Sequence, residues 1–273
     1  MTRPGLPKLI ATDLDGTLVR SDETVSAYTH EVLDRVRAAG IPVVGATGRG
    51  PRLTELTRND IRAADFLVMA GGGRVVDQSD PAGPLVLRDE RLSGAVLTRI
   101  LADLEAAVGP LTVMVEASDE PDAPLWGDYH PSWPYQDRFE ARSRAECLSC
   151  DVLKAFARTA DHHVDELLAV ARRIVPAELA TLTQAGLGFV EICPPGVDKS
   201  TGLSVVAERL GVDPAEVLVF GDQPNDLPMF GWAGWGRVAV ANAHPDVLAA
   251  ADEITLRNDD DGVAVYLDRL LSR

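Results

Sequence analysis

The sequence predicts an α/β protein with a Rossmann-like parallel-sheet core and an inserted α+β cap. Two observations carry this prediction. Short apolar runs that end at polar residues alternate with helical stripes near the start of the chain, and the same alternation returns near its end. The segment between these halves has a different pattern. Strands that alternate with helices form parallel sheets, so we assign both halves to one core and the middle segment to a second domain.

The first half contains three expected strands joined by two expected helices. The strands are expected over residues 8–12, 41–46 and 66–70, and the helices over residues 25–39 and from Pro51 onward. Gly40 is the expected C-cap of the first helix, and Pro51 suits a first helical position. This βαβαβ order predicts a parallel sheet.

The later part of the chain divides into a cap and a second core half. The cap is expected to hold helices over 92–108 and 164–174 and strands over 111–116, 152–157, 178–183 and 188–192. The core half adds a helical stripe from Leu203 to Leu210 and a strand over 217–220. We therefore expect a discontinuous core of residues 1–84 and 189–273 and a cap of residues 85–188.

Composition restricts the partners and the location of the protein. The formal net charge is −16, which argues against binding to nucleic acid or to an anionic membrane. No segment approaches the roughly 20 apolar residues of a membrane span, and no signal-peptide pattern precedes the first strand. Cys147 and Cys150 form a single C-x-x-C, and Cys193 stands apart. This odd total favours reduced thiols and a cytoplasmic location over disulfides or zinc. The sequence gives no sign of oligomeric state.

Two carboxylates follow the first expected strand, in Asp13-Leu14-Asp15-Gly16-Thr17. Gly16 permits a sharp turn that brings backbone N–H groups toward an anion. Paired carboxylates favour Mg²⁺, which takes oxygen ligands and bridges to phosphate. Asp13 is then a candidate nucleophile that forms an aspartyl phosphate, and Asp15 a candidate acid and base. An isolated D-x-D is also typical of a helix cap or a solvated loop, so the interpretation depends on the other strand ends.

One of these ends carries further acidic and amide groups. Asp222, Asn225 and Asp226 lie in Gly221-Asp222-Gln223-Pro224-Asn225-Asp226, directly after an expected strand. Parallel strands end at the same edge of a sheet, and α/β sheets bind ligands there. We therefore expect these side chains to lie near Asp13.

Groups suited to phosphate binding stand at two other positions. Thr47 offers a hydroxyl and a backbone N–H to phosphoryl oxygens, Gly48 removes steric hindrance, and Arg49 supplies a forked cation. Lys199 stands at the start of a helix and places an ammonium beside the same phosphate or beside Asp13. Each feature alone is also compatible with an ordinary loop or a solvated surface lysine.

Together these four elements resemble the four signature motifs of the haloacid dehalogenase superfamily, in order, and their spacing is similar to the Cof-type branch. The resemblance implies a Mg²⁺-dependent phosphatase of a small phosphomonoester, such as a sugar phosphate, that works through an aspartyl phosphate. It implies that Asp13 is the nucleophile, Asp15 the acid and base, and Thr47, Gly48, Arg49, Lys199 and Asn225 substrate ligands. It also implies that Asp13, Asp222 and the Asp15 carbonyl bind the metal, with Asn225 and Asp226 orienting that shell.

The chain departs from the family pattern at two positions. Gly72 stands where many relatives carry Asn, which changes the expected substrate contact of that loop. Ser200 follows Lys199, where relatives often have glycine, but serine is acceptable at a helix start. The motifs do not identify the phosphorylated substrate.

Alternative functions use the same residues. A phosphomutase or phosphotransferase would pass the phosphoryl group from Asp13 to a second hydroxyl, and phosphate release without an added acceptor distinguishes hydrolysis from it. A catalytically inactive phosphate-ligand binding protein is a third possibility, but it predicts the loss of a catalytic position. A receiver domain fits poorly, because it lacks the D-x-D-G-T context and the large insertion.

Aromatic residues concentrate in one stretch of the expected cap. These residues are Trp126, Tyr129, His130, Trp133 and Tyr135. Such a cluster can stack on a sugar or ring of the substrate, or it can close the cap core or a dimer surface. We favour the packing role over substrate contact.

Overall fold

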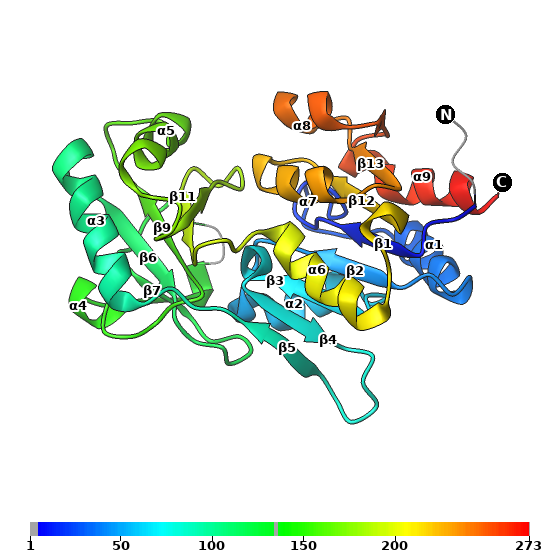
Figure 1. The fold of residues 1–273 in the computed structure, drawn as a ribbon, viewed down its shortest axis with the longest axis horizontal. Helices are drawn as coiled ribbons and strands as arrows, with labels where there is room; N and C mark the ends of the chain where they lie inside the picture. The colour runs from blue at the N-terminus through cyan, green and yellow to red at the C-terminus, as the bar shows by residue number, and fades with distance from the viewer. Residues whose placement is uncertain (1–4, 134–135, 273) are drawn as a thin grey trace.

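The computed structural model describes residues 5–133 and 136–272, and its chain forms two lobes that lie side by side (Figure 1). Each lobe is built on its own sheet, one of eight strands and one of six. The first and last parts of the chain form the larger lobe, and the middle forms the smaller one. The predicted α/β core with an inserted α+β cap is therefore confirmed.

The core sheet is parallel except at one edge. Its strands, in spatial order, are β14 (Glu253–Ile254), β13 (Gly236–Ala239), β12 (Val217–Gly221), β1 (Leu9–Thr12), β2 (Val43–Ala46), β3 (Phe66–Met69), β4 (Arg74–Asp77) and β5 (Leu85–Asp89). The first six run parallel, and β4 and β5 join antiparallel at the edge. The central strands are buried along their whole length, as strands covered on both faces require.

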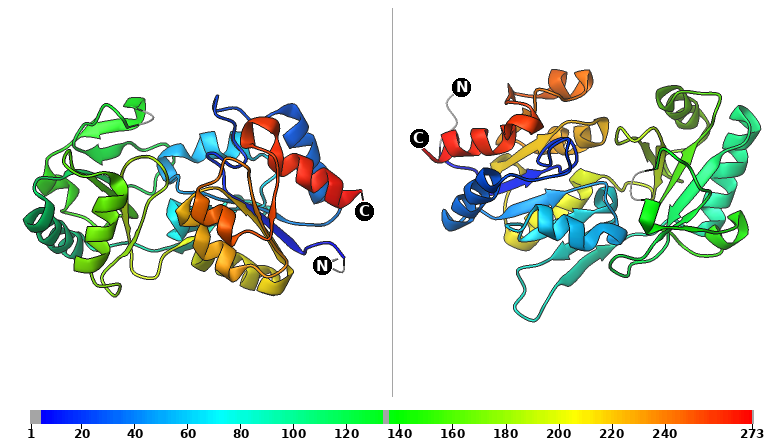
Figure 2. Two further views of the ribbon diagram at one scale, coloured as in Figure 1. Left: turned by 90° about the horizontal axis from the view of Figure 1, so that it is seen from above. Right: turned by 180° about the vertical axis from the view of Figure 1, so that it is seen from behind.

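Helices cover both faces of this sheet. They are α1 (Ala27–Ala38), α2 (Thr54–Asp60), α6 (Lys199–Leu210), α7 (Leu227–Trp232), α8 (Pro245–Ala250) and α9 (Gly262–Leu271), with single turns at η1 (Pro51–Leu53), η2 (Ala70–Gly72), η4 (Pro214–Glu216), η5 (Pro224–Asp226) and η6 (Asn258–Asp260). Figure 2 shows α1 and α9 on one face and α6 and α7 on the other. In α1 the buried side chains Val32, Leu33 and Val36 recur at helical spacing, which explains why this stripe packs on the sheet.

The cap is a six-stranded sheet with helices on the side away from the core (Figure 1). Its strands, in spatial order, are β10 (Thr181–Thr183), β11 (Val190–Cys193), β9 (Lys154–Arg158), β6 (Thr112–Glu116), β7 (Leu125–Gly127) and β8 (Phe139–Ala141). Its helices are α3 (Gly94–Val108), α4 (Arg144–Cys147) and α5 (Val164–Ile174), with one turn at η3 (Gln136–Arg138). α3 and α5 bury their apolar stripes against it.

Successive side chains of the central cap strands face opposite ways. In β9, Ala155 and Ala157 belong to the apolar cluster under the helices, whereas Lys154 and Phe156 line a pocket that also contains core residues. In β11, Val190 and Ile192 join the helix side and Glu191 lines the same pocket. One face of the cap sheet therefore packs its helices, and the other is directed at the core.

The predicted domain boundaries each differ from sheet membership by one strand. β5 lies within the segment assigned to the cap, but it pairs with β4 in the core sheet. β11 lies within the segment assigned to the core, but it pairs with β9 and β10 in the cap sheet. The sequence also gave no signal for β7 and β8. Which strand pairs with which is a long-range property that local periodicity does not contain.

Within the described residues, no helix has both the length and the apolar character needed to cross a membrane. Cys147, Cys150 and Cys193 are free thiols.

Candidate active site

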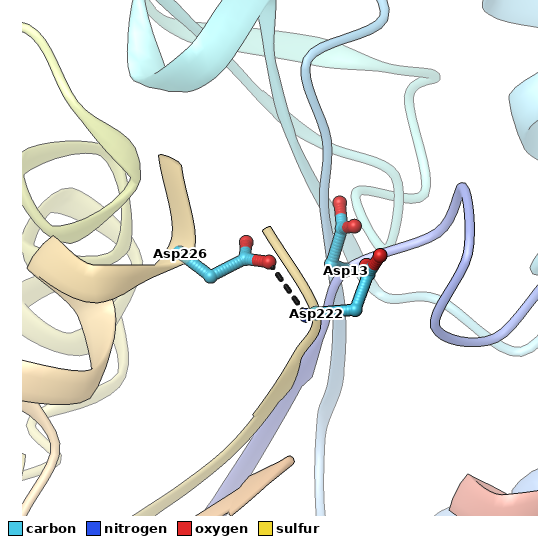
Figure 3. Close-up of side chains that lie close together, drawn as sticks. All are labelled: Asp13, Asp222 and Asp226. Atoms are coloured by element: carbon cyan, nitrogen blue, oxygen red, sulfur yellow. Dashed lines mark hydrogen bonds between the residues drawn. The ribbon is translucent and has the colours of Figure 1, made fainter. Parts of the chain in front are cut away.

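The site begins where two neighbouring strands end. β1 and β12 run parallel with Thr12 opposite Phe220, so the residues that follow them emerge together. The backbone N–H of Asp13 donates to Phe220 O at 3.0 Å, which continues the pairing of the two strands up to Asp13. Figure 3 shows Asp13 and Asp222 at these adjoining ends, with Asp226 directed toward them from the next turn. The expected meeting of the two strand ends is therefore present.

Asp13, Asp222 and Asp226 form a buried carboxylate cluster, in which one oxygen from each lies within 4.8 Å of the others. The hydroxyl of Thr17 donates to Asp222 Oδ1 at 2.6 Å, and the side-chain amide of Gln223 donates to Asp222 Oδ2 at 2.9 Å. Asp226 Oδ2 accepts the backbone N–H groups of Asp222 and Gln223, both at 2.9 Å. These bonds fix the carboxylates before any ligand arrives.

Lys199 lies against the same cluster and is 1% exposed. Its Nζ donates to Asp13 Oδ1 at 2.6 Å and to Asp226 Oδ1 at 2.5 Å. The position follows from the start of α6, where Asp198 is the N-cap and accepts the backbone N–H of Thr201 at 2.9 Å. A buried ammonium between two carboxylates is satisfied electrostatically, which explains why it can be buried at all.

Charge in this cluster remains unbalanced without a further cation. Burial raises the pKa of Asp13 well above its usual range, although Lys199 opposes this. Burial and the neighbouring Asp226 raise the pKa of Asp222 to about 6. Burial alone would lower the pKa of Lys199. The negative charges of Asp13 and Asp226 outweigh the effect of burial and raise this pKa above its usual range. Three buried carboxylates with one ammonium fit a divalent cation, whose hard oxygen-ligand preference matches this donor set.

Gly16 is required by the close approach of the two strand-end loops. Its φ is +84°, and a Cβ there would lie 2.6 Å from Asp222 Oδ2. Any larger residue would displace a carboxylate of the cluster. The carbonyl of Gly16 accepts the side-chain amide of Asn242 at 2.8 Å, which holds this turn from a third loop.

Asp15 is not part of the carboxylate cluster, and its side chain pairs with Arg49. The guanidinium of Arg49 donates to Asp15 Oδ1 from Nη2 at 2.6 Å and to Asp60 Oδ2 from Nη1 at 2.6 Å. The Asp15 side chain is 50% exposed, whereas that of Arg49 is 4% exposed. Arg49 was expected to be a substrate ligand, but its guanidinium already donates to two carboxylates of the chain. In this arrangement it orients Asp15 at the edge of the pocket.

Thr47 is fully buried at the end of β2. Its backbone N–H donates to Val68 O at 2.8 Å, so the expectation that this N–H is available to a phosphoryl oxygen is wrong. Residues that extend a strand use their N–H groups in the sheet ladder. The hydroxyl oxygen accepts the Arg49 backbone N–H at 3.0 Å, which ties Thr47 to the loop that holds Asp15.

The departure at Gly72 has a packing explanation. Its φ is +113°, and a Cβ there would lie 2.0 Å from the carbonyl oxygen of Asp198. Gly202 makes the reciprocal close approach, since its Cβ would lie 3.0 Å from the Cα of Gly72. Two glycines therefore allow the η2 turn to pack against the start of α6, close to Lys199.

A pocket of about 230 Å³ lies above the carboxylates, between core and cap. Its core walls include Asp13, Asp15, Gly48, Arg49 and Asn225, and its cap walls include Lys154, Phe156 and Glu191, which the sequence reasoning missed. The available signal was a charged residue inside an apolar strand pattern. Lys154 is one of three lysines in the chain and is fully buried.

The aromatic cluster packs mainly within the cap. Trp133 is 3% exposed, and its ring centroid lies 4.7 Å from that of Phe156 and 5.1 Å from that of Phe189. Trp126 lies under the guanidinium of Arg142 at 4.0 Å, and Tyr129 is 59% exposed. The favoured packing role fits Trp133 and Trp126. Tyr135 lies outside the described residues.

The comparisons with known proteins agree with this site. A model of the haloacid dehalogenase-like hydrolase family matches residues 10–267, so the chain belongs to this family. It is 27% identical over 298 residues to the 5-amino-6-(5-phospho-D-ribitylamino)uracil phosphatase YwtE of Bacillus subtilis (strain 168), covering 97% of this chain and 98% of that one. It is 30% identical over 264 residues to the phosphoglycolate phosphatase of Archaeoglobus fulgidus, covering 97% of each.

A solved haloacid dehalogenase-like hydrolase from B. subtilis has the same fold, with a TM-score of 0.81, 25% identity, and coverage of 96% of this chain and 99% of that one. The predicted family is confirmed, and more particularly the chain is a Cof-type member. The predicted class of enzyme, a phosphoric monoester hydrolase, is confirmed with it.

Proposed function

We propose that this protein is a Mg²⁺-dependent phosphatase that hydrolyses a small phosphomonoester, such as a sugar phosphate, through an aspartyl phosphate on Asp13. The observation that carries the proposal is the position of Asp13. Its carboxylate is fixed by Lys199 at 2.6 Å, belongs to a cluster with Asp222 and Asp226, and lies at the floor of the pocket.

The proposed metal ligands are Asp13, Asp222 and the backbone carbonyl of Asp15. A bound Mg²⁺ would neutralise charge on the phosphate and on the attacking carboxylate. Asp226 supports the arrangement, since it accepts backbone N–H groups with one oxygen and Lys199 with the other. Holding the ligands in place through such outer contacts is the usual arrangement around metal sites.

The proposed reaction has two steps. Asp13 attacks phosphorus, the bond to the leaving alcohol breaks, and Asp15 gives its proton to the alcohol oxygen. Asp15 then takes a proton from the water that attacks the aspartyl phosphate, which releases phosphate and restores Asp13. Arg49 orients Asp15 for both proton transfers through its bonds to Asp15 and Asp60.

The proposed phosphate ligands are Lys199, the Thr47 hydroxyl, the Gly48 loop and Asn225. Asn225 is 8% exposed and lines the pocket, and within the described part of the chain its Oδ1 has no hydrogen-bond partner. Side-chain amides and ammonium groups at such an edge stabilise charge on a transferring phosphoryl group. We assign these residues to substrate binding.

We also propose a core of residues up to 89 and from 194 onward, with the cap between, following the membership of β5 and β11 in the two sheets. A cytoplasmic location is proposed from the three free thiols. A small phosphorylated molecule, and neither nucleic acid nor membrane, is the proposed partner, given the net charge of −16.

The test is phosphate release from a panel of phosphomonoesters, with and without Mg²⁺, for the natural protein beside Asp13→Asn. We expect release that requires Mg²⁺ and disappears in the variant. Phosphate release that persists in Asp13→Asn would refute the proposal that Asp13 is the nucleophile. Release only after addition of an acceptor alcohol would identify a phosphotransferase instead.

A further inference from the structure

We propose that the pocket selects esters whose leaving group is uncharged and hydroxylated, and that the Lys154–Glu191 pair of the cap makes this selection. The inference rests on the proposed function, because it concerns the alcohol part of the ester that Asp13 would release. It identifies two residues of the cap as specificity determinants.

The pair sits at the phosphate end of the pocket. Lys154 and Glu191 lie on adjacent strands β9 and β11 and are 0% and 2% exposed. Lys154 Nζ donates to Glu191 Oε1 at 2.8 Å and to the carbonyl of Gly48 at 2.6 Å. Gly48 directly follows Thr47, so a cap-borne ion pair reaches the loop that we assign to phosphate binding. A leaving group attached to that phosphate must pass beside the pair.

The pair retains hydrogen-bonding capacity that the protein does not use. An ammonium has three donors. The two contacts above occupy two of them, and Lys154 Nζ also lies 4.6 Å from the centroid of the Phe156 ring, which accepts no conventional hydrogen bond. Oε2 of Glu191 is buried and finds no hydrogen-bond partner in residues 5–133 and 136–272. A buried carboxylate oxygen without a partner is costly. A hydroxyl both donates and accepts, so it can satisfy Glu191 and Lys154 together. A carboxylate or phosphate cannot donate to Glu191.

The charge around the pocket also disfavours a second anion. Each cation that the described residues place in the pocket wall contacts a carboxylate of the chain: Arg20 with Asp261 at 2.6 Å, Arg49 with Asp15 at 2.6 Å, Arg52 with Glu116 at 3.6 Å, and Lys154 with Glu191 at 2.8 Å. Arg52 Nε and Nη1 have no hydrogen-bond partner in the described residues, but the charge of Arg52 is offset by Glu116. An anionic leaving group would therefore meet no cation whose charge is not already balanced by a carboxylate. Repulsion from these carboxylates is strong where solvent is excluded.

The test compares two esters that differ at one carbon. Glycerol 3-phosphate carries a CH₂OH group where 3-phosphoglycerate carries a carboxylate. We expect the natural protein to show kcat/KM at least about tenfold higher for glycerol 3-phosphate. Repulsion between two like charges a few ångströms apart in a partly buried site is strong enough to lower kcat/KM by at least that factor. Equal values, or a preference for 3-phosphoglycerate, would overturn the inference.

Glu191→Gln removes the negative charge and keeps the shape of the side chain. We expect this variant to lower the ratio of kcat/KM for glycerol 3-phosphate to kcat/KM for 3-phosphoglycerate by about tenfold or more. The reason is that the amide carries no negative charge and can donate to a carboxylate. A merely structural defect would lower both values together and leave their ratio unchanged, which would refute the assignment. Glu178→Gln, an exposed cap carboxylate that does not line the pocket, is the control for net charge. An equal shift in the control would also refute it.

Dissociation constants of the same two esters, measured by calorimetry on Asp13→Asn with Mg²⁺, separate this inference from the proposed function. Hydrolysis by the natural protein without selectivity would refute only the inference. Selective binding with no hydrolysis of either ester, or of p-nitrophenyl phosphate, would refute only the proposed function. The binding ratio also decides the question should Glu191→Gln fail to fold.

Discussion

The core and the cap hold their charged pocket residues in different ways. In the core, Asp13 and Asp222 follow the ends of parallel strands, so chain direction alone brings them together. In the cap, Lys154 and Glu191 lie inside strands, and only the pairing of β9 with β11 makes them neighbours. Strand ends can therefore be recognised in a sequence as sites, whereas charged residues within strands acquire their role from their partners.

The two regions also differ in what they contribute. The core supplies the fixed cluster of Asp13, Asp222, Asp226 and Lys199. The cap supplies the opposite wall and contacts the core through the loop over 48–52, where Lys154 bonds to Gly48 and Arg138 Nη1 donates to Arg52 O at 2.9 Å. We therefore expect chemistry to depend on the core, and substrate fit and cap stability to depend on the cap. The following predictions test that division.

The largest effect is expected from the core nucleophile. Asp13→Asn should lower kcat by about 10⁴-fold or more, because loss of a covalent nucleophile removes the whole catalytic route. The variant should remain folded, since Lys199 keeps its bond to Asp226. Single-turnover phosphate release with the best ester is the measurement. A loss of only tenfold would mean that another group attacks phosphorus.

The next largest effect is a loss of stability in the cap, from a residue that we expect to have no role in chemistry. Trp133→Ala should lower the free energy of unfolding by about 3–5 kcal/mol, because Trp133 packs on Phe156 and Phe189. Tyr129→Ala, at an exposed position, should change it by less than about 0.5 kcal/mol. Urea titration followed by circular dichroism measures both. Equal effects would show that Trp133 does not stabilise the cap through its contacts with Phe156 and Phe189.

Metal binding should stabilise the core. Mg²⁺ at about 100 times its dissociation constant should raise the free energy of unfolding by about 2.7 kcal/mol, as for any ligand that binds only the folded state. Thermal denaturation with Mg²⁺ and with a chelator measures this. Asp222→Asn should lose most of the difference, because it removes one carboxylate of the cluster. An undiminished difference would place the metal elsewhere.

The smallest effect concerns the contact between the two regions. A Cβ at Gly50 would lie 2.2 Å from the carboxyl carbon of the buried Glu116 side chain, so Gly50→Ala should displace this side chain and loosen the contact between β6 and the core loop. We expect kcat/KM to fall about tenfold through misplacement of the substrate. Gly231→Ala, where a Cβ would meet nothing within 4 Å, is the matched control. Steady-state kinetics of both variants provide the measurement, and an unchanged kcat/KM in Gly50→Ala would separate cap position from catalysis.

Much of the fold was predictable because it depends on local signals. α5 was expected over 164–174 and spans Val164–Ile174, and α1 was expected over 25–39 and spans Ala27–Ala38. Periodicity and capping residues decide such helices. β7 and β8 were missed because three-residue strands carry almost no periodicity. β5 was assigned to the wrong domain because its pairing with β4 is not a local property.

The sequence by itself determined the family, the α/β core, the inserted cap and the approach of Asp13 and Asp222, because strand direction and sheet edge follow from the order of the elements. Only the tertiary structure decided that Asp226 shares Lys199 with Asp13, that Arg49 holds Asp15, and that Lys154 and Glu191 close the pocket. The physical reason is that a charged side chain acquires its state from the groups packed around it. Those groups come from distant parts of the chain, and no local pattern specifies them.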